Sequence, residues 1–307
     1  MSDTTASLRR KIASAGELQS VVRTMKAVAA SSIGQYEQSV RALADYYRTV
    51  ELGLGACFRA SEPATSTSPG GRARPDQAVI GAVVFGSDQG LVGQFNEVVA
   101  DLAIKSLAAL PGKPRVWAVG ERVHARLADA GFPPIALFPL PSAVEAIAPL
   151  VGQILVASER PHDGVEVTEL HLFHNHPTTG AVYAPVNERL LPLDEGWRKK
   201  LAEQPWPTGA LPEVMGNATA TLRGFIRGYL FISLFRACAE SLASENASRL
   251  AAMQRADKNI DDLLKDLKGA FQRLRQSSID EELFDVIAGF EALSKVGTSK
   301  VSPKVEP

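Results

Sequence analysis

Three histidines close together are the first candidates for chemistry in this sequence. His171, His174 and His176 lie in a segment with the composition of a strand, and imidazole nitrogens are common ligands for zinc. Because side chains alternate along a strand, His174 and His176 would share one face and His171 would point away from it. The neighbouring residues supply no third ligand. We therefore favour ordinary histidines at the surface or at the edge of a hairpin, and a metal site stays open as the alternative.

A glycine-rich turn is the second candidate. Gly86-Ser-Asp-Gln-Gly-Leu-Val-Gly93 follows a predicted strand and precedes a predicted helix, which is the context in which backbone amides hold a phosphate or a dinucleotide. The spacing is Gly-x-x-x-Gly-x-x-Gly, however, and Asp88 would place a negative charge where a pyrophosphate should bind. We therefore favour tight packing of the strand against the helix over nucleotide binding.

The two cysteines, Cys57 and Cys238, fall on different predicted helices. If both helices leave the same domain together, the two residues lie roughly 30 Å apart, which is far beyond disulfide reach. They also lack zinc-site spacing, which fits a reducing compartment. No nucleophile–base pair and no repeated carboxylate motif is evident. We therefore expect no catalytic site, no metal and no cofactor in this chain.

The composition limits the classes of partner. With 307 residues and 45% hydrophobic content, the chain can form one large domain or two smaller ones. The net charge of −1 gives no overall attraction to nucleic acid or to a lipid surface. Residues 1–6 do not resemble a signal peptide, and no run of eighteen apolar residues occurs. We expect no nucleic-acid partner and no direct insertion into a membrane.

The elements that must position these residues begin with a long stretch without proline, from Glu213 to Ser302. Since proline inside a helix costs about 3 kcal/mol, this stretch predicts one helix from Met215 to about Leu293, roughly 120 Å long. Its far end carries apolar residues with no partner expected in the same chain, so that we expect a socket in another protein to cover them. These residues are Leu283, Phe284, Val286, Ile287, Phe290 and Leu293.

The first part of the chain predicts a second long helix, about 50 residues in length. From Leu8 to Leu54 the apolar residues recur at steps of three and four, which indicates the narrow stripe of a coiled coil. Gly53 and Gly55, followed by Ser61-Glu62-Pro63, are expected to end the helix. The stripe consists of Leu8, Ile12, Ala15, Leu18, Val22, Met25, Ala29, Ile33, Tyr36, Val40, Leu43, Tyr47, Val50 and Leu54.

Between the two helices, predicted strands alternate with predicted helices, which favours a small α/β domain with a mainly parallel sheet and an antiparallel edge. The predicted strands are 78–85, 115–120 and 135–138, with a hairpin at 166–173 and 181–186, and residues 190–212 are expected to be irregular. The sequence thus predicts five segments: a coiled-coil helix (1–58), a flexible linker (59–76), an α/β domain (77–212), a second coiled-coil helix (213–295) and a disordered tail (296–307).

Four segments resemble the gamma subunit of F-type ATP synthases, and they follow the family's order over nearly the whole chain. The segments at the two ends are the most specific, whereas the glycine turn would carry little weight alone. They are residues 8–14 with 22–30, residues 87–96, residues 240–253 and residues 275–293.

The resemblance implies an antiparallel coiled coil of the N- and C-terminal helices beside a Rossmann-like α/β domain. It also implies a central-stalk rotor without enzyme activity of its own, in a complex with three alpha and three beta subunits, the epsilon subunit and the membrane c-ring. Such a chain would lie at the cytoplasmic face of a bacterial inner membrane as a peripheral protein. The coupling ion, proton or sodium, and the direction of turnover in the cell stay open.

The family's partner contacts transfer only where this sequence matches its motifs. By resemblance, Met25 and Lys26 face the beta subunits, and Arg249, Arg275, Gln276 and Glu282 engage beta-subunit loops. The apolar tip that turns in a sleeve would be formed by Leu283, Val286, Ile287 and Phe290.

Departures from the family pattern indicate a divergent bacterial member, consistent with an alternative ATP synthase operon. Asp280, Asp285 and Ala288-Gly289-Phe290 replace the usual Thr, Glu and Ser-Gly-Ala, and Ser31-Ser32-Ile33 replaces a usual basic residue. Two other functions remain as alternatives to the rotor. One is a passive coiled-coil scaffold, and the other is a nucleotide-binding enzyme built on the α/β domain.

Overall fold

The computed structural model describes residues 4–60, 79–160, 167–179, 182–210, 212–213 and 216–298, without the side chains of residues 113 and 292–298. The predicted linker (59–76) and tail (296–307) lie mainly outside these residues. The chain forms two compact units, one from residues 26–252 and one from residues 1–25 together with 253–307. The five-segment division of the sequence stays a prediction.

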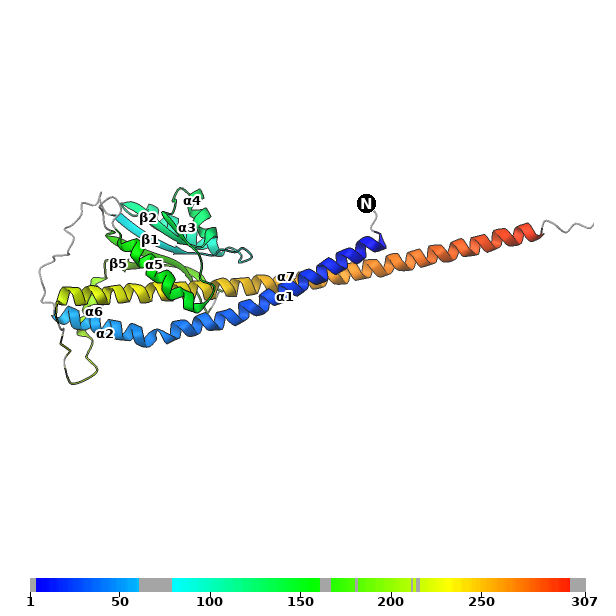
Figure 1. Ribbon diagram of the computed structural model, residues 1–307. Helices are drawn as coiled ribbons and strands as arrows, with labels where there is room; N and C mark the ends of the chain where they lie inside the picture. Colours follow the sequence, from blue (N-terminus) through cyan, green and yellow to red (C-terminus); the bar gives the residue numbers. More distant parts are fainter. Residues whose placement is uncertain are drawn as a thin grey trace, which may run out of the picture. The chain divides into compact units, whose positions relative to one another are not determined.

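The larger unit contains a five-stranded sheet in the order β3-β2-β1-β4-β5 (Figure 1). β1 pairs in parallel with β2 and β4, β2 pairs in parallel with β3, and β5 is the antiparallel edge strand beside β4. The predicted mixed α/β fold is therefore confirmed. The strands are β1 (Val79–Phe85), β2 (Lys113–Val119), β3 (Ala136–Phe138), β4 (Glu169–His176) and β5 (Ala184–Leu191).

Helices pack on both faces of this sheet. The side chains of each strand alternate between the two faces, so that both faces present apolar side chains to a layer of helices. Ile80, Ala82 and Val84 pack with α3 (Phe95–Ala108) and α4 (Glu121–Asp129). Val83 and Phe85 pack instead with α5 (Ile147–Glu159) and with α7 (Ala218–Thr298), as Figure 1 also shows. A 3₁₀ turn, η2 (Val144–Ala146), precedes α5. The sheet is thus buried between two helical layers, one of which includes the long helix.

The predicted first helix is divided in two. α1 (Thr5–Ala42) ends one residue before α2 (Ala44–Ala60), and Leu43 between them forms a turn. Gly53 and Gly55, which were expected to begin the end of this helix, lie inside it, since α2 continues to Ala60. The predicted stop at Ser61-Glu62-Pro63 lies outside the described residues. A Cβ on Gly53 would lie 2.2 Å from the Phe225 ring, and one on Gly55 would lie 2.5 Å from the Leu201 carbonyl oxygen. These glycines therefore permit close packing of helices instead of ending one.

The segment predicted to be irregular, 190–212, contains a helix that the sequence pattern does not predict. α6 (Glu195–Glu203) begins with Asp194 as its N-cap, whose carboxylate accepts a hydrogen bond of 2.8 Å from the backbone amide of Trp197. Buried Leu201 then packs with α2 and α7. Because this helix is short and has a single buried residue, its apolar periodicity was too weak to predict.

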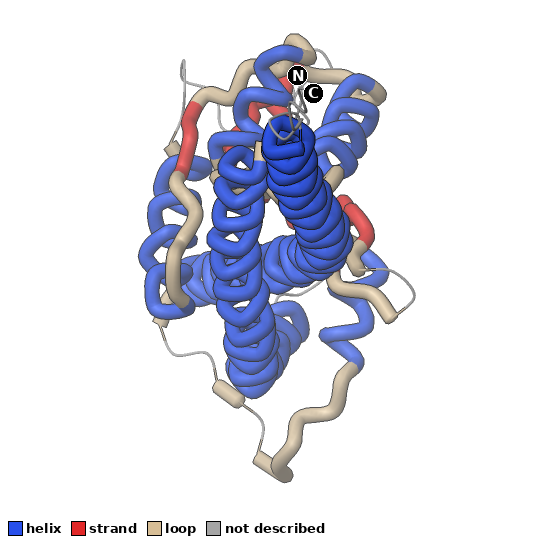
Figure 2. Tube along the Cα trace, turned by 90° about the vertical axis from the view of Figure 1, so that its right-hand side faces the viewer, coloured by secondary structure: helices blue, strands red, loops and turns tan. Residues whose placement is uncertain are grey.

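The smaller unit is a pair of helices formed by residues 5–25 of α1 and residues 253–298 of α7. The two helices lie side by side in both views (Figures 1 and 2). Gln19 donates a hydrogen bond to Asp261, Arg23 lies 3.1 Å from Asp257, and Arg9 lies over the ring of Phe271. Since later residues of α1 meet earlier residues of α7, the pair is antiparallel, as predicted.

The buried stripe of this pair differs from the predicted stripe at Leu18. This side chain is 55% exposed, and the neighbouring Gln19 takes its place in the interface. The error arose from choosing the more apolar of two adjacent residues. A polar Gln19 is tolerated in the interface because Asp257 and Asp261 accept hydrogen bonds from its amide.

The distal segment of α7, residues 275–290, has no helix beside it in the described part of the chain. α1 begins at Thr5, close to where Arg9 meets Phe271, and every side chain from 275 to 290 is exposed. From Arg275 to Thr298 the helix continues for about 24 residues, or about 36 Å. About half of the α7 residues in this unit therefore lie beside α1, and the other half form a single helix.

Candidate functional site

The distal segment carries the predicted apolar tip on its surface. Leu283 is 58% exposed, Val286 70%, Ile287 46% and Phe290 75%. Ile279 and Phe284 are also exposed, and Ile279 extends the set by one turn at the helical spacing of four, a signal that the sequence analysis did not use. Monomeric proteins rarely leave so many large apolar side chains in contact with water. The chemistry of this segment is therefore that of a binding surface.

Three of the predicted polar contacts lie on the same distal segment. Arg275, Gln276 and Glu282 are all exposed, so that their side chains are available to another protein. Their proximity to the apolar tip gives the segment both hydrophobic and charged groups. Such a combination is typical of protein interfaces, where charged groups contribute to specificity.

Arg249, by contrast, is directed into the chain. Its guanidinium lies 2.6 Å from the carboxylate of Glu245, one helical turn earlier, and the two side chains are only 12% and 6% exposed. Burial raises the pKa of Glu245, and the charge of Arg249 only partly offsets this effect. Any contact of Arg249 with a partner would therefore compete with a buried ion pair. Its predicted role in partner binding stays a prediction.

Met25 and Lys26 lie in α1 and are half-buried. Two other basic residues of this helix are used inside the chain, since Arg23 pairs with Asp257 and Arg9 lies over Phe271. Only some of the basic side chains of the first helix are therefore left to contact partners. The role of Met25 and Lys26 at the beta subunits also stays a prediction.

The glycine turn makes the contacts expected for tight packing. The Asp88 carboxylate accepts hydrogen bonds from the backbone amides of Glu121 and Leu140 at 2.9 and 3.0 Å. A Cβ on Gly86 would lie 2.4 Å from Val123, so that only glycine fits against α4. Ser248 of α7 also donates a hydrogen bond to the carbonyl oxygen of Val92. Asp88 thus joins the ends of neighbouring strands, and the turn is attached to the long helix.

The three histidines differ most from their predicted environment. His174 is fully buried and His171 is 6% exposed, so that the interpretation as surface histidines is wrong for these two. The predicted division between the faces of the strand is confirmed: His171 bonds to Glu169 and Asn187, while His174 and His176 both bond to Glu240. Glu240 belongs to α7, far away in the sequence, which is why no local pattern could reveal it.

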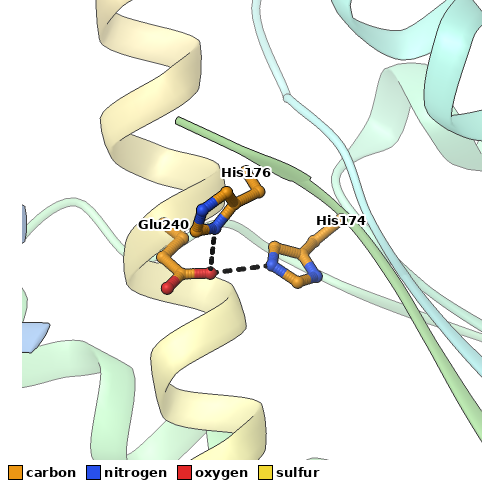
Figure 3. A group of neighbouring side chains, drawn as sticks. All are labelled: His174, His176 and Glu240. Carbon is orange, nitrogen blue, oxygen red and sulfur yellow. Dashed lines mark hydrogen bonds and ion pairs between the residues drawn. The ribbon is translucent and has the colours of Figure 1, made fainter. Parts of the chain in front are cut away.

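Figure 3 shows His174 and His176 converging on one oxygen of Glu240, at 2.9 Å from each ring. Burial by itself would raise the pKa of this carboxyl group. The hydrogen bonds and charges of the two histidines outweigh burial, and the pKa of Glu240 lies below its usual value. The group is the one cluster of potential metal ligands found among the described residues. Its two hydrogen bonds link β4 to α7.

Among the described helices, none combines the length and the apolar character that crossing a membrane requires.

Comparison with known proteins agrees with the fold and with the resemblance in the sequence. The family model described as ATP synthase matches residues 4–293. The ATP synthase gamma chain of Parafrankia sp. is 28% identical over 297 residues, covering 93% of this chain and 96% of the relative. That of Moorella thermoacetica is 27% identical, covering 93% of this chain and 98% of the relative.

Solved structures show the same fold at lower sequence identity. A chain of the Euglena gracilis mitochondrial ATP synthase, solved with OSCP, F1 and c-ring in rotational state 3, is 16% identical with a TM-score of 0.58. The match covers 99% of this chain and 98% of that one. A chain of the Tetrahymena thermophila central stalk and c-ring is 20% identical with a TM-score of 0.52, covering 77% of this chain and 99% of that one. Since the family model matches nearly the whole sequence, the protein belongs to the family of ATP synthase gamma chains.

Proposed function

We propose that this chain is the central-stalk rotor of an F-type ATP synthase. In this role it couples ion movement through a membrane c-ring to ATP synthesis or hydrolysis at sites on alpha and beta subunits, and it also contacts epsilon. The chain is a peripheral component at the cytoplasmic face of a bacterial inner membrane. The coupling ion is a property of the membrane subunits, and this chain does not select it.

The observation that carries this proposal is the distal segment, residues 275–290. A single helix with this many exposed apolar side chains is poorly suited to water. Enclosing it in an apolar sleeve formed by other subunits would remove these side chains from water while leaving the helix free to turn. The solved relatives include a chain of a central stalk with a c-ring.

The polar residues have a separate role in the proposal. Arg275, Gln276 and Glu282 contact loops of the beta subunits, as do Met25 and Lys26 on the first helix. Because the distal segment presents a different side chain in each direction, its rotation changes which groups face each of three surrounding beta subunits. Arg249 supports this coupling mainly through its ion pair with Glu245, which fixes its position on α7.

Reconstitution tests this function directly. The purified chain should show no ATPase activity alone, because its role is to drive changes in the beta sites. Mixed with alpha and beta subunits of the same organism, it should form a stable complex whose ATPase activity depends on its presence. A stable and fully active enzyme that lacks this chain would contradict the proposal.

A further inference from the structure

The cluster of His174, His176 and Glu240 is not used by the rotor function. His174 and His176 come from the end of β4, and Glu240 comes from α7. Their potential ligand atoms all lie within 4.8 Å of one another. Figure 3 shows both rings directed at the same side of the carboxylate. A packing role alone would not require two imidazoles to meet at a single oxygen.

We propose that these three side chains bind a divalent transition-metal cation of the Zn²⁺ class. The ligands are Nε2 of His174, Nδ1 of His176 and Oε2 of Glu240, the atoms that already meet in the structure. Two imidazole nitrogens and one carboxylate oxygen are a donor set that zinc uses in proteins, with a fourth position open to water. Magnesium and calcium prefer sites made of oxygen ligands, so that they fit this donor set less well.

The two nitrogen–oxygen distances require only a small expansion, and the two ring nitrogens lie within 4.8 Å of each other. Zinc bonds to nitrogen and oxygen measure about 2.0–2.2 Å, which separates neighbouring ligands of a tetrahedral ion by about 3.4 Å. The two nitrogen–oxygen distances are 2.9 Å, so that each must open by about 0.5 Å. The side chain of His176 is 48% exposed, and this ring is free to make most of the adjustment.

The surrounding charges also favour a cation. Arg236 lies 2.8 Å from Glu188, its closest carboxylate, and 4.0 Å from Oε1 of Glu240. Within these described contacts, two carboxylates share one guanidinium, so that a negative charge is left over when both imidazoles are neutral, which is the form that binds a metal. Arg236 faces one oxygen of Glu240, while the other oxygen faces the histidines. It would therefore hold the carboxylate in the orientation needed for the metal.

The site is accessible to a cation from solvent, and a bound metal would link two elements of the fold. His174 is fully buried and the Glu240 side chain is 12% exposed, while His176 opens to solvent. A cation can therefore reach the site from the side of His176, and a water molecule can complete its coordination there. Once bound, the metal would join the end of β4 to the long helix. The site would bind its ion whether or not the chain turns as a rotor.

Titration of the purified full-length chain with Co²⁺ tests this inference, because Co²⁺ reports a tetrahedral nitrogen–oxygen site by its visible absorption and can be displaced by Zn²⁺. The test variants are His176→Gln and Glu240→Gln, which preserve side-chain size. His124→Gln on α4 is the matched control, since His124 lies outside the cluster. Circular dichroism establishes that each variant is folded.

The wild type should bind one equivalent of Co²⁺ and release it to Zn²⁺. His176→Gln should weaken binding at least tenfold, and the His124→Gln control should match the wild type. Because Glu240 is partly buried, its variant could unfold, and the exposed His176 alone then decides the test. Absence of binding to the wild type, or equal binding to wild type and folded His176→Gln, would overturn the inference.

Discussion

Two parts of α7 have opposite relations to water although they belong to one helix. Between Leu230 and Ser248 most side chains are buried, and Leu234, Ala237 and Ala239 are fully buried. Between residues 275 and 290 every side chain is exposed, including large apolar ones. The side chains of the first part pack against the sheet, α1 and α2. No described element packs against the second part in this way.

This contrast separates residues that stabilise the chain from residues that the rotor proposal assigns to contacts with other subunits. Burial of an apolar side chain stabilises a protein by about 1.5–3 kcal/mol, a contribution that the distal segment does not make within this chain. Its apolar residues therefore cannot be explained by the stability of the isolated chain. The rotor proposal explains them by binding to other subunits.

The largest expected difference is between two leucine truncations. Leu234→Ala should lower the free energy of unfolding of the purified chain by about 2–5 kcal/mol, because it leaves a cavity in the core. Leu283→Ala, the matched exposed position, should change it by no more than about 0.5 kcal/mol. Urea denaturation measures both. Equal losses would mean that the distal segment is packed in the free chain.

A smaller effect is expected where α2 approaches α7. Gly53→Ala should destabilise the chain by about 1–3 kcal/mol, because the new Cβ would lie 2.2 Å from the Phe225 ring. Gly34→Ala is the control, since a Cβ there would meet no other described segment within 4 Å, and it should stabilise α1 by up to about 1 kcal/mol. Thermal unfolding distinguishes them. A neutral Gly53→Ala variant would contradict the close contact.

The buried carboxyl group of Glu245 gives a pH dependence to the covered part of α7. Its folded pKa is raised by burial, so that the folded chain binds a proton more tightly than the unfolded chain. Stability should therefore fall as the pH rises from the unfolded pKa, near 4.3, through the folded value, by about 1.4 kcal/mol for each pH unit between them. Glu245→Gln should lack this contribution. Identical pH profiles would contradict the raised pKa.

The smallest effects on stability are expected for the polar residues of the distal segment. Arg275→Ala and Glu282→Ala should each change the unfolding free energy by at most about 0.5 kcal/mol, because both side chains are exposed. In the reconstituted complex, however, they should lower ATPase activity. Stability and activity are measured on the same preparations. A loss of stability without a loss of activity would contradict their assignment as partner contacts.

Elements with strong periodicity were predictable from the sequence. The proline-free stretch predicted α7, the continuous apolar run at 78–85 predicted β1, and the alternation of strands and helices predicted the mixed sheet. The alternation rule also placed His174 and His176 on one face. These features depend on local residue patterns, which a single sequence contains.

Other features depended on contacts between distant residues. Glu240 meets the histidines only after β4 packs against α7, so that no local spacing could identify it. The choice of Gln19 over Leu18 depended on Asp257 and Asp261 across the helix pair. The close approach of Phe225 to Gly53 likewise explained a glycine that local rules treat as a helix end. Tertiary contacts decided all three.

The most direct test of the rotor proposal is a comparison of two truncations in the reconstituted complex. One removes all residues after Ser278, including the apolar tip, and the other removes only Lys300–Pro307. Torque in single-molecule rotation, together with the yield of complex, is the measurement. We expect the first truncation to reduce torque or assembly strongly and the second to have little effect. Equal and negligible effects of the two would contradict a distal segment that turns within a sleeve.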